Sequence, residues 1–109
     1  MKTKKPASEK LLPSVHPGEV LMEEFMRPLA LTAYRVARDI GSTPITIGKI
    51  IRGQRSVSPE MALRLARYFR MTPDFWLGLQ RAYDLETASR AKSSAIESRV
   101  SPCPSLAVA

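Results

Sequence analysis

The chain has 109 residues with 44% hydrophobic content, which is ordinary for one soluble globular domain with a modest core. No stretch approaches the roughly 20 apolar residues of a membrane-spanning helix, and no apolar segment of a secretory signal follows the basic N-terminus. The single cysteine, Cys103, cannot form a disulfide within the chain. The sequence therefore predicts a cytoplasmic protein that makes no membrane contact.

The net charge of +7 is unevenly distributed along the chain. Residues 27–55 contain five Arg and one Lys against one acid, Asp39, whereas residues 15–26 contain three Glu and no Lys or Arg. A segregated basic segment is typical of a protein that binds a polyanion. A solvated basic face without a partner has the same composition, so charge alone does not decide between the two.

Start and stop signals divide the middle of the chain into five helices. Serine or threonine N-caps, prolines at first helical positions and glycines just beyond helix ends mark the boundaries. Between these signals, apolar residues recur at helical spacing, and no segment alternates with the period of a strand. The fold class is therefore all-α. The expected helices run from about Gly18 to Met26, from Thr32 to Ile40, from Thr43 to just before Gly53, from Ser58 through Phe69 and from Thr72 through Tyr83.

The two ends of the chain lack a sustained apolar period. Residues 1–14 are rich in Lys and residues 87–109 are rich in Ser and Ala, and both contain prolines. We therefore expect a flexible basic arm at 1–14, one folded domain at 15–86 and a disordered tail at 87–109.

The second and third helices form a helix-turn-helix motif. Only Gly41 and Ser42 separate them, which is too short a connection for antiparallel packing, so the helices must cross steeply. Ala37 is small where they cross, and Ile47 and Ile50 pin the third helix onto the second. Two packed helices without DNA also fit this spacing, but the basic residues fall on the outer face, which favours DNA.

The outer face of this motif supplies the candidate DNA contacts. The N-terminal end of the third helix enters the major groove in this motif, where hydroxyls reach base edges and an apolar side chain meets a thymine methyl group. Cationic side chains further along, and the start of the second helix, suit phosphates. The predicted DNA-binding residues are Thr32, Tyr34, Arg35, Thr43, Pro44, Ile45, Thr46, Lys49, Arg52 and Arg55.

No other residues make a convincing reactive site. His16 is the only histidine and has no cysteine near it, so a capping or packing role is favoured over metal binding. Glu23 and Glu24 are adjacent and point in different directions on a helix, which makes them a poor acid–base pair. The stripe of Trp76 and Tyr83 is typical of a core. The sequence predicts no enzymatic activity, no cofactor and no metal.

Four stretches of the chain together resemble the HigA-type antitoxins, a branch of the XRE (Cro/repressor-like) helix-turn-helix superfamily. They are HPGEVLMEEFMRPLALT from His16, AYRVARDIG from Ala33, IIRGQRSVSPEMALRLARYF from Ile50 and TPDFWLGLQRAYDLE from Thr72. The resemblance implies a five-helix, lambda-repressor-like DNA-binding domain, usually homodimeric. Such proteins repress their own operon and neutralise a RelE/HigB-like toxin that cleaves mRNA.

Three positions depart from the pattern of this family. Ser42 stands where an apolar residue is usual, Gly48 replaces a frequently polar side chain, and Ala33 stands where many members have a phosphate-binding Gln. The family pattern therefore does not give the operator sequence.

The expected partner is a palindromic double-stranded operator bound by a homodimer, with Arg81, Tyr83 and Leu85 of the fifth helix as candidate dimer contacts. Two alternatives stay open from the sequence. One is a stand-alone XRE regulator without a toxin. The other is a protein-binding module whose basic face docks an acidic partner without reading DNA.

Overall fold

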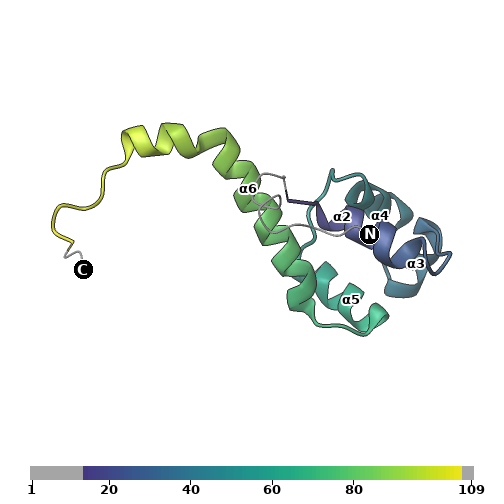
Figure 1. The fold of residues 1–109 in the computed structure, drawn as a ribbon. Coiled ribbons are helices and arrows are strands. Elements are labelled where there is room, and N and C mark those ends of the chain that lie inside the picture. The colour runs from purple at the N-terminus through teal and green to yellow at the C-terminus, as the bar shows by residue number, and fades with distance from the viewer. Residues whose placement is uncertain (1–13, 107–109) are drawn as a thin grey trace.

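The computed structural model describes residues 14–106, which fold into helices without a strand (Figure 1). The helices are α2 (Pro17–Val20), the π-helix η1 (Leu21–Met26), α3 (Ala33–Ile40), α4 (Pro44–Ile51), α5 (Pro59–Phe69) and α6 (Pro73–Arg99). Since α2 runs directly into η1, the pair is the first expected helix, and the all-α, five-helix prediction is confirmed. The predicted basic arm, except for Ser14, and the last three residues of the predicted tail lie outside the described residues.

Local side-chain caps fix where the helices begin. Three hydroxyls accept a backbone N–H three residues ahead, which satisfies one of the N–H groups that a helix start leaves without a partner. These bonds join Thr32 to Arg35, Thr43 to Thr46 and Ser58 to Met61, at 3.0, 3.1 and 3.1 Å. Thr72 occupies the N-cap position of α6 but makes no side-chain capping bond.

The helices bury apolar side chains in one common core. Leu21, Val36, Leu65 and Trp76 are completely buried, as is Ala37, the small residue expected where α3 crosses α4. Tyr83, expected in the core, is only partly buried, as is Phe69 at the end of α5. Helix α6 packs against α5 and also touches α2, and α2 in turn touches α4, so α2 is held between the recognition motif and the last helix.

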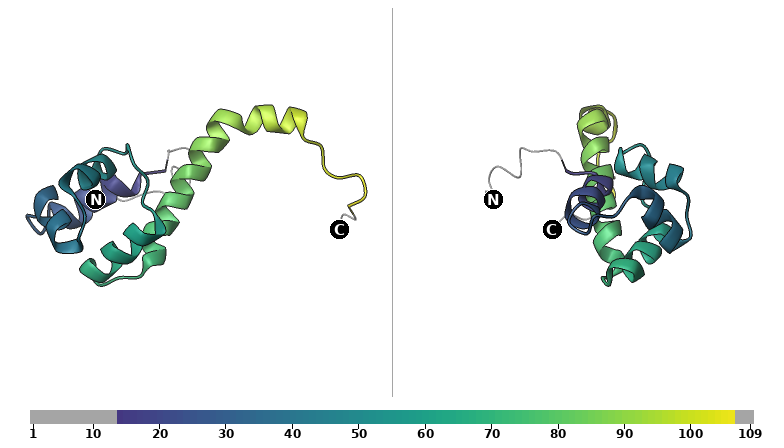
Figure 2. Two further views of the ribbon diagram at one scale, coloured as in Figure 1. Left: turned by 180° about the vertical axis from the view of Figure 1, so that it is seen from behind. Right: turned by 90° about the vertical axis from the view of Figure 1, so that its right-hand side faces the viewer.

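The prediction of a disordered tail from Thr87 is wrong for residues 87–99, because α6 continues to Arg99 and extends away from the body of the fold (Figures 1 and 2). No Gly or Pro interrupts residues 79–101, and the composition is rich in helix-forming residues. An ion pair one turn apart, Arg90 to Glu86 at 2.6 Å, adds support. A helix with these features needs no apolar stripe, which is the signal that the sequence lacks.

His16 caps the first helix and connects it to the last. Its Nδ1 accepts the N–H of Gly18 at 2.9 Å, and its ring meets the ring of Tyr83 edge-on, with 4.9 Å between centroids. The prediction of a capping or packing role is therefore confirmed. Because Nδ1 accepts a hydrogen bond, the imidazole must carry no proton on that nitrogen.

We expect this cap to make folding stability depend on pH. Burial lowers the pKa of His16 from its usual 6.5, against a smaller opposite effect of the Asp84 charge. The unfolded chain therefore takes up this proton first, so the contribution of His16 is complete well above pH 6.5 and is lost as the pH falls from 6.5 through the lower folded pKa.

Denaturant unfolding at several pH values from about 8 to about 5 measures this effect, with His16→Asn as the control, because asparagine is also a good N-cap but does not titrate. The variant should lose the His16 part of the pH dependence. Equal pH dependence in the two proteins would contradict the assignment.

Candidate nucleic-acid interface

The turn between α3 and α4 has the geometry that the sequence predicts. Gly41 adopts a left-handed conformation with φ 77°, and the Ser42 N–H donates to the carbonyl of Ala37 at 2.8 Å. From α5, Arg64 Nη1 donates to the carbonyls of Ile40 and Gly41 at 2.6 and 3.3 Å. The end of α3 is thus capped by both backbone and side chain, which fixes how α4 leaves the turn.

Helix α4 has one buried face and one exposed face. Ile47 and Ile50 are 0% and 1% exposed, whereas Ile45 is 70% exposed. An isoleucine this exposed gains little from burial within the fold, so its side chain is available to contact a partner. Thr43, Pro44 and Lys49 are also exposed, and Thr46 is half-buried. The predicted division of α4 into an inner and an outer face is confirmed.

The two threonines of α4 are not equivalent. Thr43 Oγ1 accepts the N–H of Thr46 at 3.1 Å and also donates to Thr46 Oγ1 at 3.0 Å, so its hydroxyl is occupied as a helix cap. Thr46 Oγ1 caps no backbone N–H, and Thr43 is its one hydrogen-bond partner within residues 14–106. Of the two hydroxyls, Thr46 is therefore the one equipped to donate to an acceptor on a base edge.

The cationic side chains lie beyond these threonines. Lys49, Arg52 and Arg55 are exposed, and neither Lys49 nor Arg55 makes an ion pair with another residue of 14–106. A Cβ at Gly48 would lie 3.2 Å from Arg52 Nη1, so the guanidinium of Arg52 folds back over this glycine. Gly48, which departs from the family pattern, thus leaves room for the side chain of Arg52.

At the start of α3, Thr32 is occupied as a cap, Tyr34 is 63% exposed, and Arg35 Nε donates to Asp39 Oδ2 at 2.8 Å. Sequence reasoning listed Arg35 but missed its carboxylate partner, although the spacing of four residues on a helix was a signal for the pair. The structure brings the ten predicted contact residues onto the two helices of the motif and the loop after them.

The outer face of the motif presents groups that can bind a nucleic acid. Within residues 14–106, no group of three or more His, Cys, Asp or Glu side chains is placed to hold a metal ion. Over the same residues, no helix is both long and apolar enough to cross a membrane. Exposed hydroxyl, apolar and cationic groups remain, and these can contact the edges and phosphates of a nucleic acid.

The packed pair of α3 and α4, its glycine turn and the surrounding helices define an all-helical helix-turn-helix domain. The helix-turn-helix family model matches residues 22–76, and the chain belongs to the XRE-type helix-turn-helix family. Virulence-associated protein I of Dichelobacter nodosus is 42% identical over 89 residues, which cover 82% of this chain and 82% of that protein.

Two solved structures extend the comparison. The Pseudomonas aeruginosa antitoxin HigA, solved with the higBA promoter, superposes with a TM-score of 0.80 at 38% identity, over 82% of this chain and 97% of that one. Antitoxin GraA in complex with its operator has a TM-score of 0.79 at 37% identity, over 100% and 99% of the two chains. The resemblance to HigA-type antitoxins is confirmed.

Proposed function

We propose that this protein is a sequence-specific double-stranded DNA-binding antitoxin that represses its own toxin–antitoxin operon in the cytoplasm. The exposed outer face of α4 carries the proposal, because it presents Ile45, the hydroxyl of Thr46 and a cationic flank on one side of a helix-turn-helix motif. The HigA and GraA relatives solved with promoter or operator DNA support the same function.

The proposed operator is a palindrome bound by a homodimer. A symmetric dimer presents two recognition helices about 34 Å apart, one helical turn of DNA. Of the candidate dimer contacts on α6, Arg81 is exposed and Leu85 is 69% exposed, whereas Tyr83 is half-buried beside His16. Leu85 is therefore the best of the three for a dimer contact. Light scattering should give twice the mass of one chain, and a monomer both free and on DNA would contradict the dimer.

The proposed second partner is a RelE/HigB-like toxin. Such ribonucleases are basic, and Glu19, Glu23 and Glu24 of the first helix are exposed, which makes this helix a candidate contact by charge complementarity. Glu23 already pairs with Arg27 at 3.0 Å, so Glu19 and Glu24 are the residues whose charge should be reversed, by Glu19→Lys and Glu24→Lys. These substitutions should weaken toxin capture without weakening operator binding, and an equal loss of both would indicate misfolding.

The deciding experiment is a titration of the full chain with a duplex from its own promoter region and with a scrambled duplex, at several salt concentrations. Operator binding releases counterions, so affinity should fall steeply with salt while the preference for the promoter remains. Capture of a basic partner from the native host then tests the antitoxin role. Promoter binding without such a partner would favour the stand-alone regulator, and absence of DNA binding would favour the protein-binding module.

A further inference from the structure

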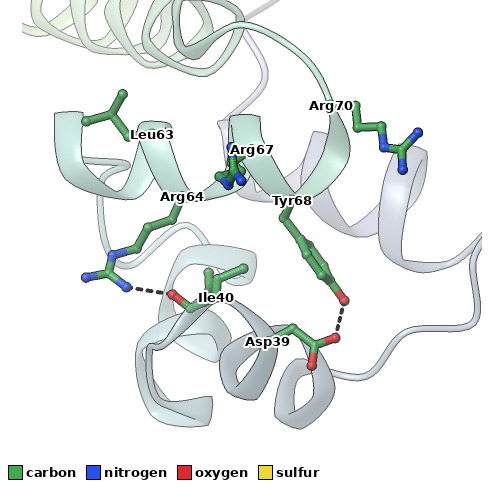
Figure 3. Close-up of a pocket in the computed structure, with 7 residues that line it drawn as sticks. All are labelled: Asp39, Ile40, Leu63, Arg64, Arg67, Tyr68 and Arg70. Atoms are coloured by element: carbon green, nitrogen blue, oxygen red, sulfur yellow. Dashed lines mark hydrogen bonds between the residues drawn. The ribbon is translucent and has the colours of Figure 1, made fainter.

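A single carboxylate, Asp39, gathers donors from two helices at the edge of the recognition motif. Arg35 Nε donates to Asp39 Oδ2 at 2.8 Å, and Tyr68 OH donates to the same oxygen at 2.5 Å. Arg38 Nε lies 3.7 Å from the other carboxylate oxygen. Figure 3 shows Tyr68 reaching from α5 across to Asp39 on α3. We call these four residues the Asp39 cluster.

The surrounding groups favour the ionised form of the Asp39 carboxylate. The hydrogen bond from Tyr68, and after it the hydrogen bond and charge of Arg35, lower the pKa of Asp39 from its usual value. Asp39 is also the only acid in the basic segment 27–55, and its side chain is 23% exposed although arginines surround it. The negative charge of Asp39 by itself weakens the attraction of this segment to a polyanion. Asp39 must therefore contribute to the site in some way other than through its charge.

The geometry shows what Asp39 can do instead, which is to restrain the side chain of Arg35. An arginine side chain loses considerable rotamer freedom when it docks on a phosphate, and a side chain that is already held loses less. The cluster uses Nε of Arg35, one of five N–H donors, which leaves the two Nη groups free for a further acceptor. Tyr68 in turn fixes the carboxylate itself, because it donates from a different helix.

We propose that Asp39 and Tyr68 are positioning residues for operator recognition, which hold the guanidinium of Arg35 in the one place where it meets a phosphate when α4 is in register. This inference deepens the proposed function and rests on it. A restrained guanidinium contacts a phosphate only in the correctly docked complex, whereas an unrestrained one can contact phosphates of any DNA. The cluster therefore raises the ratio of operator affinity to random-DNA affinity.

A matched control exists because α5 reaches α3 twice. Arg64 also crosses from α5 to α3, but it bonds the backbone carbonyls at the end of α3 and touches no predicted DNA contact. A variant of Arg64 therefore loosens the same pair of helices and leaves Arg35 held. Because Arg64 also fixes how α4 leaves the turn, Arg64→Met should weaken promoter binding by displacing α4, and this loss should persist in an Arg35→Ala background.

The first test is Tyr68→Phe, which removes one hydroxyl and no charge. We expect the dissociation constant for the promoter duplex to rise about three- to tenfold, the coupling typical of residues in one polar network, with little change on the scrambled duplex. In an Arg35→Ala background the same substitution should have no further effect. A Tyr68→Phe effect that persists without Arg35, as the effect of Arg64→Met should, would overturn the proposal.

The second test is Asp39→Asn, which removes the ionic partner of Arg35 and Arg38, weakens the hold on Arg35 and adds one positive charge. Affinity for the scrambled duplex should rise, and the slope of log affinity against log salt should steepen by about one per protomer. Preference for the promoter should nevertheless fall. Unchanged preference in both Asp39→Asn and Tyr68→Phe would refute the positioning role while the wild type still binds its promoter. Failure of the wild type to bind the promoter would refute the proposed function itself.

Discussion

Replacement of Gly18 by alanine is expected to lower the free energy of unfolding by about 3 kcal/mol or more, the upper range for overpacking of a buried site. The added Cβ would lie 1.7 Å from the carbonyl oxygen of Ile50, 2.5 Å from its carbon and 3.0 Å from Cα of Ile51. All three atoms belong to the backbone of α4, so no side-chain rotation relieves the clash. The first helix and the recognition helix must move apart.

Because this contact sets the distance between α2 and α4, Gly18→Ala should also weaken operator binding in any protein that stays folded. Denaturant unfolding measures the stability, and circular dichroism separates a folded variant from an unfolded one. A stability loss below about 1 kcal/mol, the mean for point substitutions, would show that α2 is not held this closely.

Gly78→Ala is the matched control for this prediction. Gly78 lies inside α6, and an added Cβ would meet nothing within 4 Å apart from its own helix and neighbours. Alanine in a helix interior is favoured over glycine, so this variant should gain about 0.5–1 kcal/mol. The same substitution thus acts in opposite directions at the two glycines, and only the α4 backbone accounts for the difference.

What the sequence predicted correctly depends on neighbours along the chain. The caps Thr32, Thr43 and Ser58 bond residues three positions ahead, and the inward face of α4 follows from helical spacing. Such relations involve one helix at a time, so the chain pattern contains them. The full length of α6 does not follow from an apolar stripe, because a helix that leaves the body of the fold does not need one.

The relations that escaped the sequence join residues distant in the chain. Gln80 is buried, and its Oε1 accepts the N–H of Val57 at 2.7 Å, which ties α6 to the loop before α5. Tyr68 bonds Asp39 across 29 positions. A single polar residue in a helix has no pattern of its own, so only the packing of the helices reveals its partner.

The second large effect expected is on DNA binding, and it separates base contacts from phosphate contacts. Thr46→Ala should cost about 1–3 kcal/mol on the operator and little on random DNA, because it removes the hydroxyl available to a base edge. Thr46→Val, which keeps the branched shape without the hydroxyl, should have the same effect as Thr46→Ala. Thr43 is the poorer site for this test, since its loss removes a helix cap worth about 1 kcal/mol.

Arg52→Ala should weaken operator and random DNA alike and reduce the salt slope by about one unit per half-site, because a phosphate contact carries no sequence information. The side chain folds over Gly48, beyond the first turn of α4 that carries Thr46, where the flanking backbone of the groove is expected. Binding titrations on both duplexes at several salt concentrations, with footprints of the operator, measure the two variants together. The division of roles is wrong if Thr46→Ala leaves operator preference intact while Arg52→Ala abolishes it.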